Sequence, residues 1–327
     1  MVKKFIEKIY AFPLWLRWYL YRQKIFKTEY LSKPVISIGG LKFGGVGKTP
    51  LVEHIAKILV SNGLRVSVLT RGYGRKSKKR IVIENGDGNW RDCGDEPLML
   101  SKRLPDVKIV VHPNRLESGK SVESEMDVFL LDDGFQHIQL GRNLDIIALA
   151  GDEFEDNLFP FGSRRDGLWR MENLEDAAVV VPSQNYDKIS DKIGDIPVFR
   201  CDLSIEGFCK IDDFENVIPA EKLHCKNVFL TAGIASPHRF ERTVKTTGAK
   251  IVGVKWFRDH KFSESRQVEN VIAQAKKKNA EIILTTAKDA VRLPENAREN
   301  FYSLLIRYEI EPSDKFERLI LNAILNR

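Results

Sequence analysis

Cysteine is scarce in this 327-residue sequence, and no long run of apolar residues is free of charge. The four cysteines form no CxxC pair and have no histidine at the spacing of a zinc site; they are Cys93, Cys201, Cys209 and Cys225. This argues against a disulfide scaffold or a structural zinc site and favours reduced thiols in a cytoplasmic protein. A membrane-spanning helix needs about 20 apolar residues, and Arg17 interrupts the most apolar stretch.

An excess of acidic residues is also lacking, because the formal net charge is +7. With 43% hydrophobic and 30% charged residues, the composition is that of an ordinary globular protein. Repeats and low-complexity segments are absent, and the length suits two α/β domains. The positive charge favours simple solubility or an anionic partner. A nucleic acid is disfavoured, because the cations gather beside aromatic residues near the N-terminus rather than along a groove-reading motif.

Residues 1–30 combine bulky aromatic and aliphatic side chains with lysines and arginines. Trp15 and Trp18 lie among these cations, close to Arg17 and Arg22. Such a mixture suits a helix that lies in the membrane interface and is held to anionic lipid. The alternative is a helix packed on the protein's own core, with its tryptophans buried there. We favour the interfacial helix, since the aromatic residues are too many for one packing face.

A glycine-rich segment after a short β-branched run is the strongest local signal. Residues 35–38 predict a buried strand, residues 44–49 read GGVGKT, and residues 51–59 have a helical pattern. Strand, glycine loop and helix in this order predict a phosphate-binding loop, in which Lys48 reaches the outer phosphates and Thr49 ligates Mg²⁺. The predicted nucleotide-binding residues are Gly44, Gly45, Val46, Gly47, Lys48, Thr49 and Pro50. The alternative is a glycine turn without a ligand, and Lys42 stands where the strict motif has its first glycine.

A second apolar run, at residues 128–131, ends in Asp132 and Asp133. A carboxylate at the tip of a buried strand downstream of a phosphate loop is typical of the position that holds Mg²⁺ through the phosphates. Gln136 and His137 follow directly and add polar groups. The alternative is a solvated Asp-Asp-Gly turn.

Further candidates come from polar loops. Asp95 lies in a Gly-Asp-Glu-Pro segment, which is either an ordinary helix start or the source of a carboxylate that accepts the proton of an acceptor hydroxyl. Arg71 and Tyr73 could reach the rim of the site, and Arg115 and Arg165 are candidate phosphate ligands. His260 follows Asp259 in the second half of the chain, where such a pair is more often structural.

Strands that alternate with helices predict a parallel sheet with helices on both faces. We expect a P-loop NTPase-like α/β domain at residues 31–150 and a linker at residues 151–176. A second, smaller α/β domain is expected at residues 177–312. The interfacial helix at residues 1–30 precedes them, and a C-terminal helix at residues 313–327 could cross back onto the first domain. The two α/β domains should meet at a cleft.

Taken together, these segments resemble the tetraacyldisaccharide 4′-kinase family of Gram-negative bacteria. The resemblance spans nearly the whole chain and rests most firmly on GDEP at residues 94–97 and LDDGFQH at residues 131–137. It continues through residues 160–165, 232–240 and 285–290, the last of which contains Lys288. Lys42 and residues 163–166 depart from the usual family pattern.

The resemblance implies transfer of the γ-phosphoryl group of ATP to the 4′-hydroxyl of a tetraacyldisaccharide 1-phosphate in lipid A biosynthesis, with Mg²⁺. It implies that Asp95, aided by His260, activates the hydroxyl, and that Thr49, Asp132 and Asp133 hold the metal. Lys48 belongs to the catalytic set. Candidate substrate or phosphate contacts are Arg71, Tyr73, Arg115, Gln136, His137, Arg165 and Lys288. The protein would then lie peripherally on the cytoplasmic face of the inner membrane, without an obligate protein partner.

Two other classes remain open at the level of the sequence. A deviant-Walker ATPase shares the glycine loop, but Phe43 stands where such proteins carry a lysine. The second class is a non-catalytic regulator that binds membranes in a nucleotide-dependent way. A kinase moves labelled phosphate into lipid, an ATPase releases it, and a regulator does neither.

Overall fold

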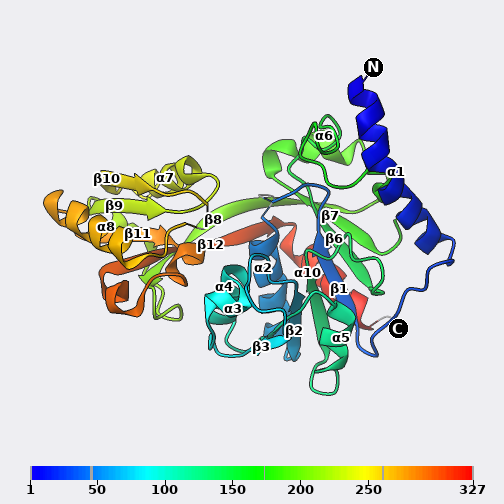
Figure 1. The fold of residues 1–327 in the computed structure, drawn as a ribbon, viewed down its shortest axis with the longest axis horizontal. Coiled ribbons are helices and arrows are strands. Elements are labelled where there is room, and N and C mark those ends of the chain that lie inside the picture. Colours follow the sequence, from blue (N-terminus) through cyan, green and yellow to red (C-terminus); the bar gives the residue numbers. More distant parts are fainter. Residues whose placement is uncertain (1, 45–46, 173, 260, 326–327) are drawn as a thin grey trace.

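The computed structural model describes residues 2–44, 47–172, 174–259 and 261–325. Within these residues the strands form one 12-stranded sheet in the order β10-β9-β11-β12-β8-β7-β6-β1-β5-β2-β4-β3 (Figure 1). Neighbouring strands are parallel except for β3 with β4 and β12 with β8. Two lobes result, and the long strands β8 and β12 run between them (Figure 1).

The first lobe is built on the strands β1 to β7. Their bounds are β1 (Val35–Gly39), β2 (Val66–Thr70), β3 (Ile81–Ile83), β4 (Lys108–Val111), β5 (Val128–Asp132), β6 (Leu144–Ala148) and β7 (Ala177–Val181). The strands β1, β2, β5 and β7 are buried along their whole length, as expected for parallel strands that helices cover on both faces. The helices are α2 (Lys48–Ser61), α3 (Trp90–Cys93), α4 (Asp95–Arg103), α5 (Arg115–Lys120) and α6 (Tyr186–Ser190).

The second lobe contains β9 (Asn227–Ala232), β10 (Lys250–Trp256) and β11 (Ile282–Thr286), with α7 (Pro237–Lys245), α8 (Ser265–Lys277) and α9 (Ala287–Ala290). The connecting strands are β8 (Val198–Lys210) and β12 (Phe301–Glu311). Short 3-10 helices complete the fold: Leu168–Met171, Ser183–Asn185, Ala220–Leu223 and Glu295–Asn300. The aromatic side chains of Phe229, Phe262 and Phe301 are buried in the core of this lobe.

The position of β7 differs from the predicted domain boundary. We expected residues 177–181 to begin the second domain, but β7 pairs with β6 and completes the sheet of the first lobe. The sequence of a fully apolar strand does not indicate which strand it pairs with, so the domain boundary could not be predicted from this segment. The chain passes to the second lobe along β8 instead (Figure 1).

Both terminal helices pack on the first lobe. In α10 (Ser313–Leu325), Phe316 and Ile320 are buried in the same core as Ile55 of α2. The helix α1 (Val2–Arg22) lies at the end of the molecule away from the second lobe (Figure 1). None of the helices in the described ranges is both long and apolar enough to cross a membrane.

Candidate active site

A cavity of about 1280 Å³ opens between the two lobes. The carboxyl ends of parallel strands, where ligands bind in open α/β sheets, line it from the first lobe; among them are Thr70 of β2 and Asp132 of β5. Ser236, Arg239 and Lys288 line it from the second lobe. The cleft predicted between two α/β domains is therefore present.

The phosphate loop leads directly into α2. Gly47 precedes this helix with φ of 75°, a left-handed conformation that favours glycine. A Cβ atom at Gly47 would lie 1.5 Å from the hydroxyl oxygen of Tyr308, which comes from β12. Lys48 and Thr49 form the first turn of α2 and line the cavity. The helix thus presents its N-terminus and a lysine to the cavity, as an anion site requires. Gly45 and Val46 lie outside the described residues.

Lys42 does not face the cavity. It is buried, and its Nζ lies 2.6 Å from Asp152 and 3.2 Å from Asp156. Burial alone would lower the pKa of Lys42, but hydrogen bonds to these carboxylates raise it. The backbone of Phe43 donates to Ser163, and that of Arg165 donates to Leu41. The two departures from the family pattern, at Lys42 and at residues 163–166, thus lie against each other, where Lys42 joins the loop to β1.

The two aspartates at the end of β5 have opposite surroundings. Asp132 is buried and accepts a 2.8 Å hydrogen bond from Thr70 Oγ1. Burial raises its pKa to about 6, and the negative charge of Glu96 adds to this. Asp133, at φ of 53°, turns toward Lys48 and Arg165 and forms ion pairs with both. Burial would raise the pKa of Asp133, but these two cations hold it well below its usual range.

Asp95 and Glu96 begin α4 and line the same cavity. Asp95 is buried, and its Oδ1 accepts a 2.9 Å hydrogen bond from the backbone of Glu96. Glu96 forms a 2.8 Å ion pair with Lys288 of the second lobe. Burial would lower the pKa of Lys288, but the charge of Glu96 raises it. Asp259 also lines the cavity, whereas His260 lies outside the described residues.

Known proteins resemble this chain along nearly its whole length. A family model described as tetraacyldisaccharide-1-P 4′-kinase matches residues 4–325. The tetraacyldisaccharide 4′-kinase of Desulfotalea psychrophila is 32% identical, and the match covers 97% of this chain and 94% of that protein. The one from Aquifex aeolicus is 33% identical, with 92% and 91% covered. A crystal structure of LpxK from Aquifex aeolicus in complex with ATP superposes with a TM-score of 0.82 at 29% identity, covering 98% of this chain and 97% of that chain.

The chain belongs to the tetraacyldisaccharide-1-P 4′-kinase family. The predicted family, the P-loop NTPase-like α/β fold and the kinase activity are thereby confirmed. ATP is the phosphoryl donor, and it acts with Mg²⁺. This assignment replaces the ATPase and regulator alternatives.

The residues at the cleft fit ATP and Mg²⁺. Oxygen atoms are the ligands that Mg²⁺ prefers, and it usually takes one or two carboxylates together with phosphate oxygens and water. Asp132 and Thr49 supply a carboxylate and a hydroxyl beside the phosphate loop. The raised pKa of Asp132 marks a carboxylate that a cation would stabilise.

The remaining predicted contacts divide into two groups. Arg71, Tyr73, Arg165 and Lys288 line the cavity of the kinase, and Tyr73 is 80% exposed. The other group, Arg115, Gln136 and His137, does not belong to the residues that line it.

In this second group, Arg115 is buried, and burial lowers its pKa, although the charges of Asp132 and Asp133 oppose this. Gln136 donates to the Gly40 carbonyl, and burial lowers the pKa of His137 to about 3.

Sequence reasoning missed functional neighbours that come from distant segments. Thr70 and Glu96 were not among the predicted site residues, although Thr70 donates a hydrogen bond to Asp132 and the charge of Glu96 acts on Asp132. Tyr308 and Arg292 carried no signal at all, because isolated residues of these types are usually structural.

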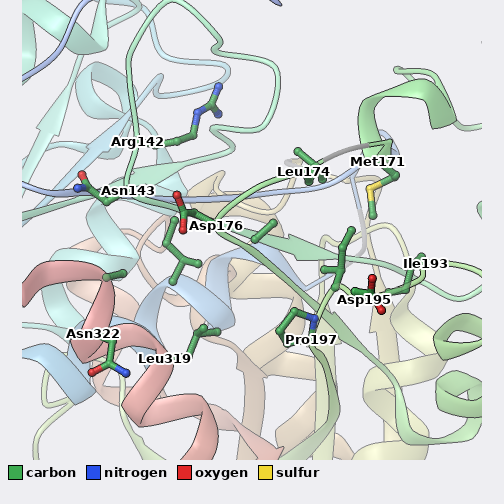
Figure 2. Close-up of a pocket in the computed structure, with 14 residues that line it drawn as sticks. Arg142, Asn143, Met171, Leu174, Asp176, Ile193, Asp195, Pro197, Leu319 and Asn322 are labelled. Atoms are coloured by element: carbon green, nitrogen blue, oxygen red, sulfur yellow. The ribbon is translucent and has the colours of Figure 1, made fainter. Parts of the chain in front are cut away.

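A second cavity, of about 800 Å³, lies at the amino ends of β6 and β7 (Figure 2). Asn143 precedes β6 and Asp176 precedes β7, and Leu319 and Asn322 of α10 also line the cavity (Figure 2). This is the amino end of the strands, where open α/β sheets do not usually bind ligands. None of the predicted site residues that the structure describes lines this cavity.

Proposed function

We propose that the kinase transfers the γ-phosphoryl group of ATP to the 4′-hydroxyl of an acylated disaccharide 1-phosphate in the cleft, and that Asp95 accepts the proton of that hydroxyl. The observation that carries the assignment of roles is the shared cavity, which Lys48, Thr49, Asp132 and Asp95 all line. Phosphoryl transfer needs alignment and charge neutralisation more than covalent chemistry. A buried carboxylate in the same cavity as the phosphate loop meets this need.

Asp132 and Thr49 are the proposed metal ligands. Mg²⁺, when bound, neutralises charge on the phosphate oxygens. Asp133 has a different proposed role, because Lys48 and Arg165 already neutralise it. It holds these two cations at the cleft, beside the N-terminus of α2. Lys48 contacts the phosphates of the donor.

Other residues that line the cavity supply the groups that handle the acceptor. Asp95 has one oxygen fixed by the backbone of Glu96, which leaves the carboxylate oriented rather than free to rotate. We assign His260 to assist Asp95. Arg71 and Tyr73 extend toward the rim of the cavity and suit contact with the phosphate and sugar of the acceptor. Arg115, close to the charges of Asp132 and Asp133, would support the proposed metal ligands, and Gln136 supports the end of β1 through the Gly40 carbonyl.

The lipid acceptor suggests a membrane surface, and α1 is the segment that fits one. Its exposed apolar side chains recur every three or four residues and form a stripe along one face: Ile6, Ile9, Phe12, Trp15 and Tyr19. The stripe supports peripheral binding to a membrane surface, which we propose to be the cytoplasmic face of the inner membrane.

The other face of α1 contacts the protein. Glu7 accepts a 2.8 Å hydrogen bond from the backbone of Leu158, and Tyr10 donates to the carbonyl of Arg165, a residue of the site. Membrane contact would therefore bring the cleft near the lipid acceptor.

Transfer of label from γ-³²P ATP to the lipid acceptor tests the assignment of Asp95. Replacing Asp95 with Asn should lower turnover by about 10²- to 10⁴-fold, since a general base contributes on this scale, while ATP still binds. Asp92→Asn, which removes an exposed carboxylate three residues earlier, is the matched control and should transfer label normally. Wild-type turnover in Asp95→Asn would contradict the proposed role of Asp95 as the proton acceptor.

A further inference from the structure

We propose that Arg292 is a positioning residue that orients the catalytic carboxylate of Asp95 from across the cleft; this rests on the proposed role of Asp95. Arg292 lies in the turn after α9 and is 2% exposed, with its guanidinium fully buried. A buried charge is unfavourable unless it is paired. The groups that contact the guanidinium therefore indicate the role of Arg292.

One edge of the guanidinium is fixed within the second lobe. Its Nη2 donates to Asp289 and, at 3.2 Å, to the carbonyl of Gly233. Asp289 in turn accepts hydrogen bonds from Thr286 Oγ1 at 2.7 Å and from the backbone of Gly233 at 3.1 Å. The hydrogen bonds of this edge are therefore all made within the second lobe, and they hold the guanidinium in place.

The other edge faces the first lobe. Nε of Arg292 lies 3.7 Å from Oδ2 of Asp95, an ion-pair distance that is longer than an N–H···O hydrogen bond. Within the part of the chain that the structure describes, Nε and Nη1 have no hydrogen-bond partner. A fully buried donor without a partner is unfavourable. An approach of the lobes by roughly 0.5–1 Å would make the hydrogen bond to Asp95.

The neighbouring contact fixes the register of this approach. Lys288 lies four residues before Arg292 and pairs with Glu96, the residue after Asp95. Two cations of the second lobe thus face two consecutive carboxylates at the start of α4. Arg292 does not line the cavity, so it acts on the reaction through Asp95 rather than by touching a substrate. With Oδ1 held by Glu96 and Oδ2 facing Arg292, the orientation of the Asp95 carboxylate is set from both lobes.

The test is a double-mutant cycle on the full-length kinase, with label transfer measured under steady-state conditions. Arg292→Gln should lower kcat by about 100-fold, the scale expected for misplacing a reacting group by 1 Å, with KM for ATP changed less than about twofold. Arg292→Lys keeps the charge and should restore part of the loss. Arg298→Gln, at an arginine of the same lobe that pairs with Asp212, is the control and should keep normal turnover.

The background of Asp95→Asn separates the possible outcomes. If Arg292 acts through Asp95, adding Arg292→Gln to Asp95→Asn lowers turnover no further. An equal loss in both backgrounds would mean that Arg292 has only a structural role, and unchanged kcat in Arg292→Gln would also overturn the proposal. If Arg292→Gln does not fold, Arg292→Lys carries the same cycle. Wild-type turnover in Asp95→Asn alone would instead refute the proposed role of Asp95 as the base, and this result is distinct from a failure of the proposal for Arg292.

Discussion

At the scale of single residues, Asp132 and Asp133 show how neighbouring carboxylates acquire different tasks. The left-handed conformation of Asp133 turns the two side chains apart. Asp132 meets Thr70, 62 residues away in the chain, and Asp133 meets Lys48, 85 residues away. The sequence could indicate both aspartates, because an apolar strand that ends in a carboxylate is a local pattern. It could not distinguish them, since their partners lie on other strands and helices.

Gly47 is a second residue whose role depends on a distant partner. An alanine there would have a strained left-handed backbone and a Cβ atom in collision with the Tyr308 hydroxyl. We expect Gly47→Ala to weaken ATP binding by about tenfold or more, measured by titration with a fluorescent ATP analogue.

Gly44→Ala is the matched comparison, because Gly44 is also left-handed, but among the described residues other than its chain neighbours no atom lies within 4 Å of the added Cβ. It should lose less affinity than Gly47→Ala. Tyr308→Phe, which removes the nearest colliding atom, should restore part of the affinity of Gly47→Ala. Equal losses in both alanine variants would show that the collision with Tyr308 is unimportant.

At the scale of elements, α1 is notable for the large apolar side chains that it exposes to solvent. The rings of Phe12, Trp15 and Tyr19 stack along it, and Phe12 is 59% exposed. Composition was enough to predict a helix with this character. Its contacts with residues 158–165 were not predictable, because they depend on where the chain returns about 150 residues later.

The apolar stripe of α1 gives a direct test of membrane binding. Phe12→Asp should weaken binding to vesicles of anionic phospholipid by about tenfold to a hundredfold, since one large apolar side chain contributes roughly 1.5–3 kcal/mol when buried. Cosedimentation with the vesicles measures this. Gln23→Asp adds the same charge at an exposed residue beyond the helix and should have a smaller effect. Vesicle binding that neither change alters would favour a helix that serves only packing.

At the scale of the whole molecule, the sequence predicted two α/β units and a cleft, because strand and helix patterns are local. It did not predict the continuous sheet, in which β8 and β12 connect the lobes. Nor did it predict the charges that join them, such as Lys288 with Glu96 and Arg292 with Asp95. A charged residue looks the same in sequence whether it faces water or a partner across a cleft.

A buried charge network ties β8 to the helices of the first lobe. Arg103 of α4 contacts Glu53 of α2 at 2.5 Å and also pairs with Glu206 of β8. The Arg103 side chain is 4% exposed, and Lys57 lies 2.7 Å from Glu53. Burial would lower the pKa of Arg103, but both glutamates raise it, so the guanidinium stays charged.

Replacing Arg103 with Met should therefore destabilise the kinase by about 3 kcal/mol, because removing one partner leaves buried carboxylates that Lys57 only partly compensates. Urea unfolding, followed by tryptophan fluorescence, measures the change in the free energy of unfolding. Arg65→Met is the control: Arg65 pairs with Asp127, but its side chain is 60% exposed, and water and salt screen such a pair. Similar losses in the two variants would mean that burial of the Arg103 network adds nothing to the stability of the molecule. A larger loss in Arg103→Met would show that the strand connecting the lobes is anchored through this arginine.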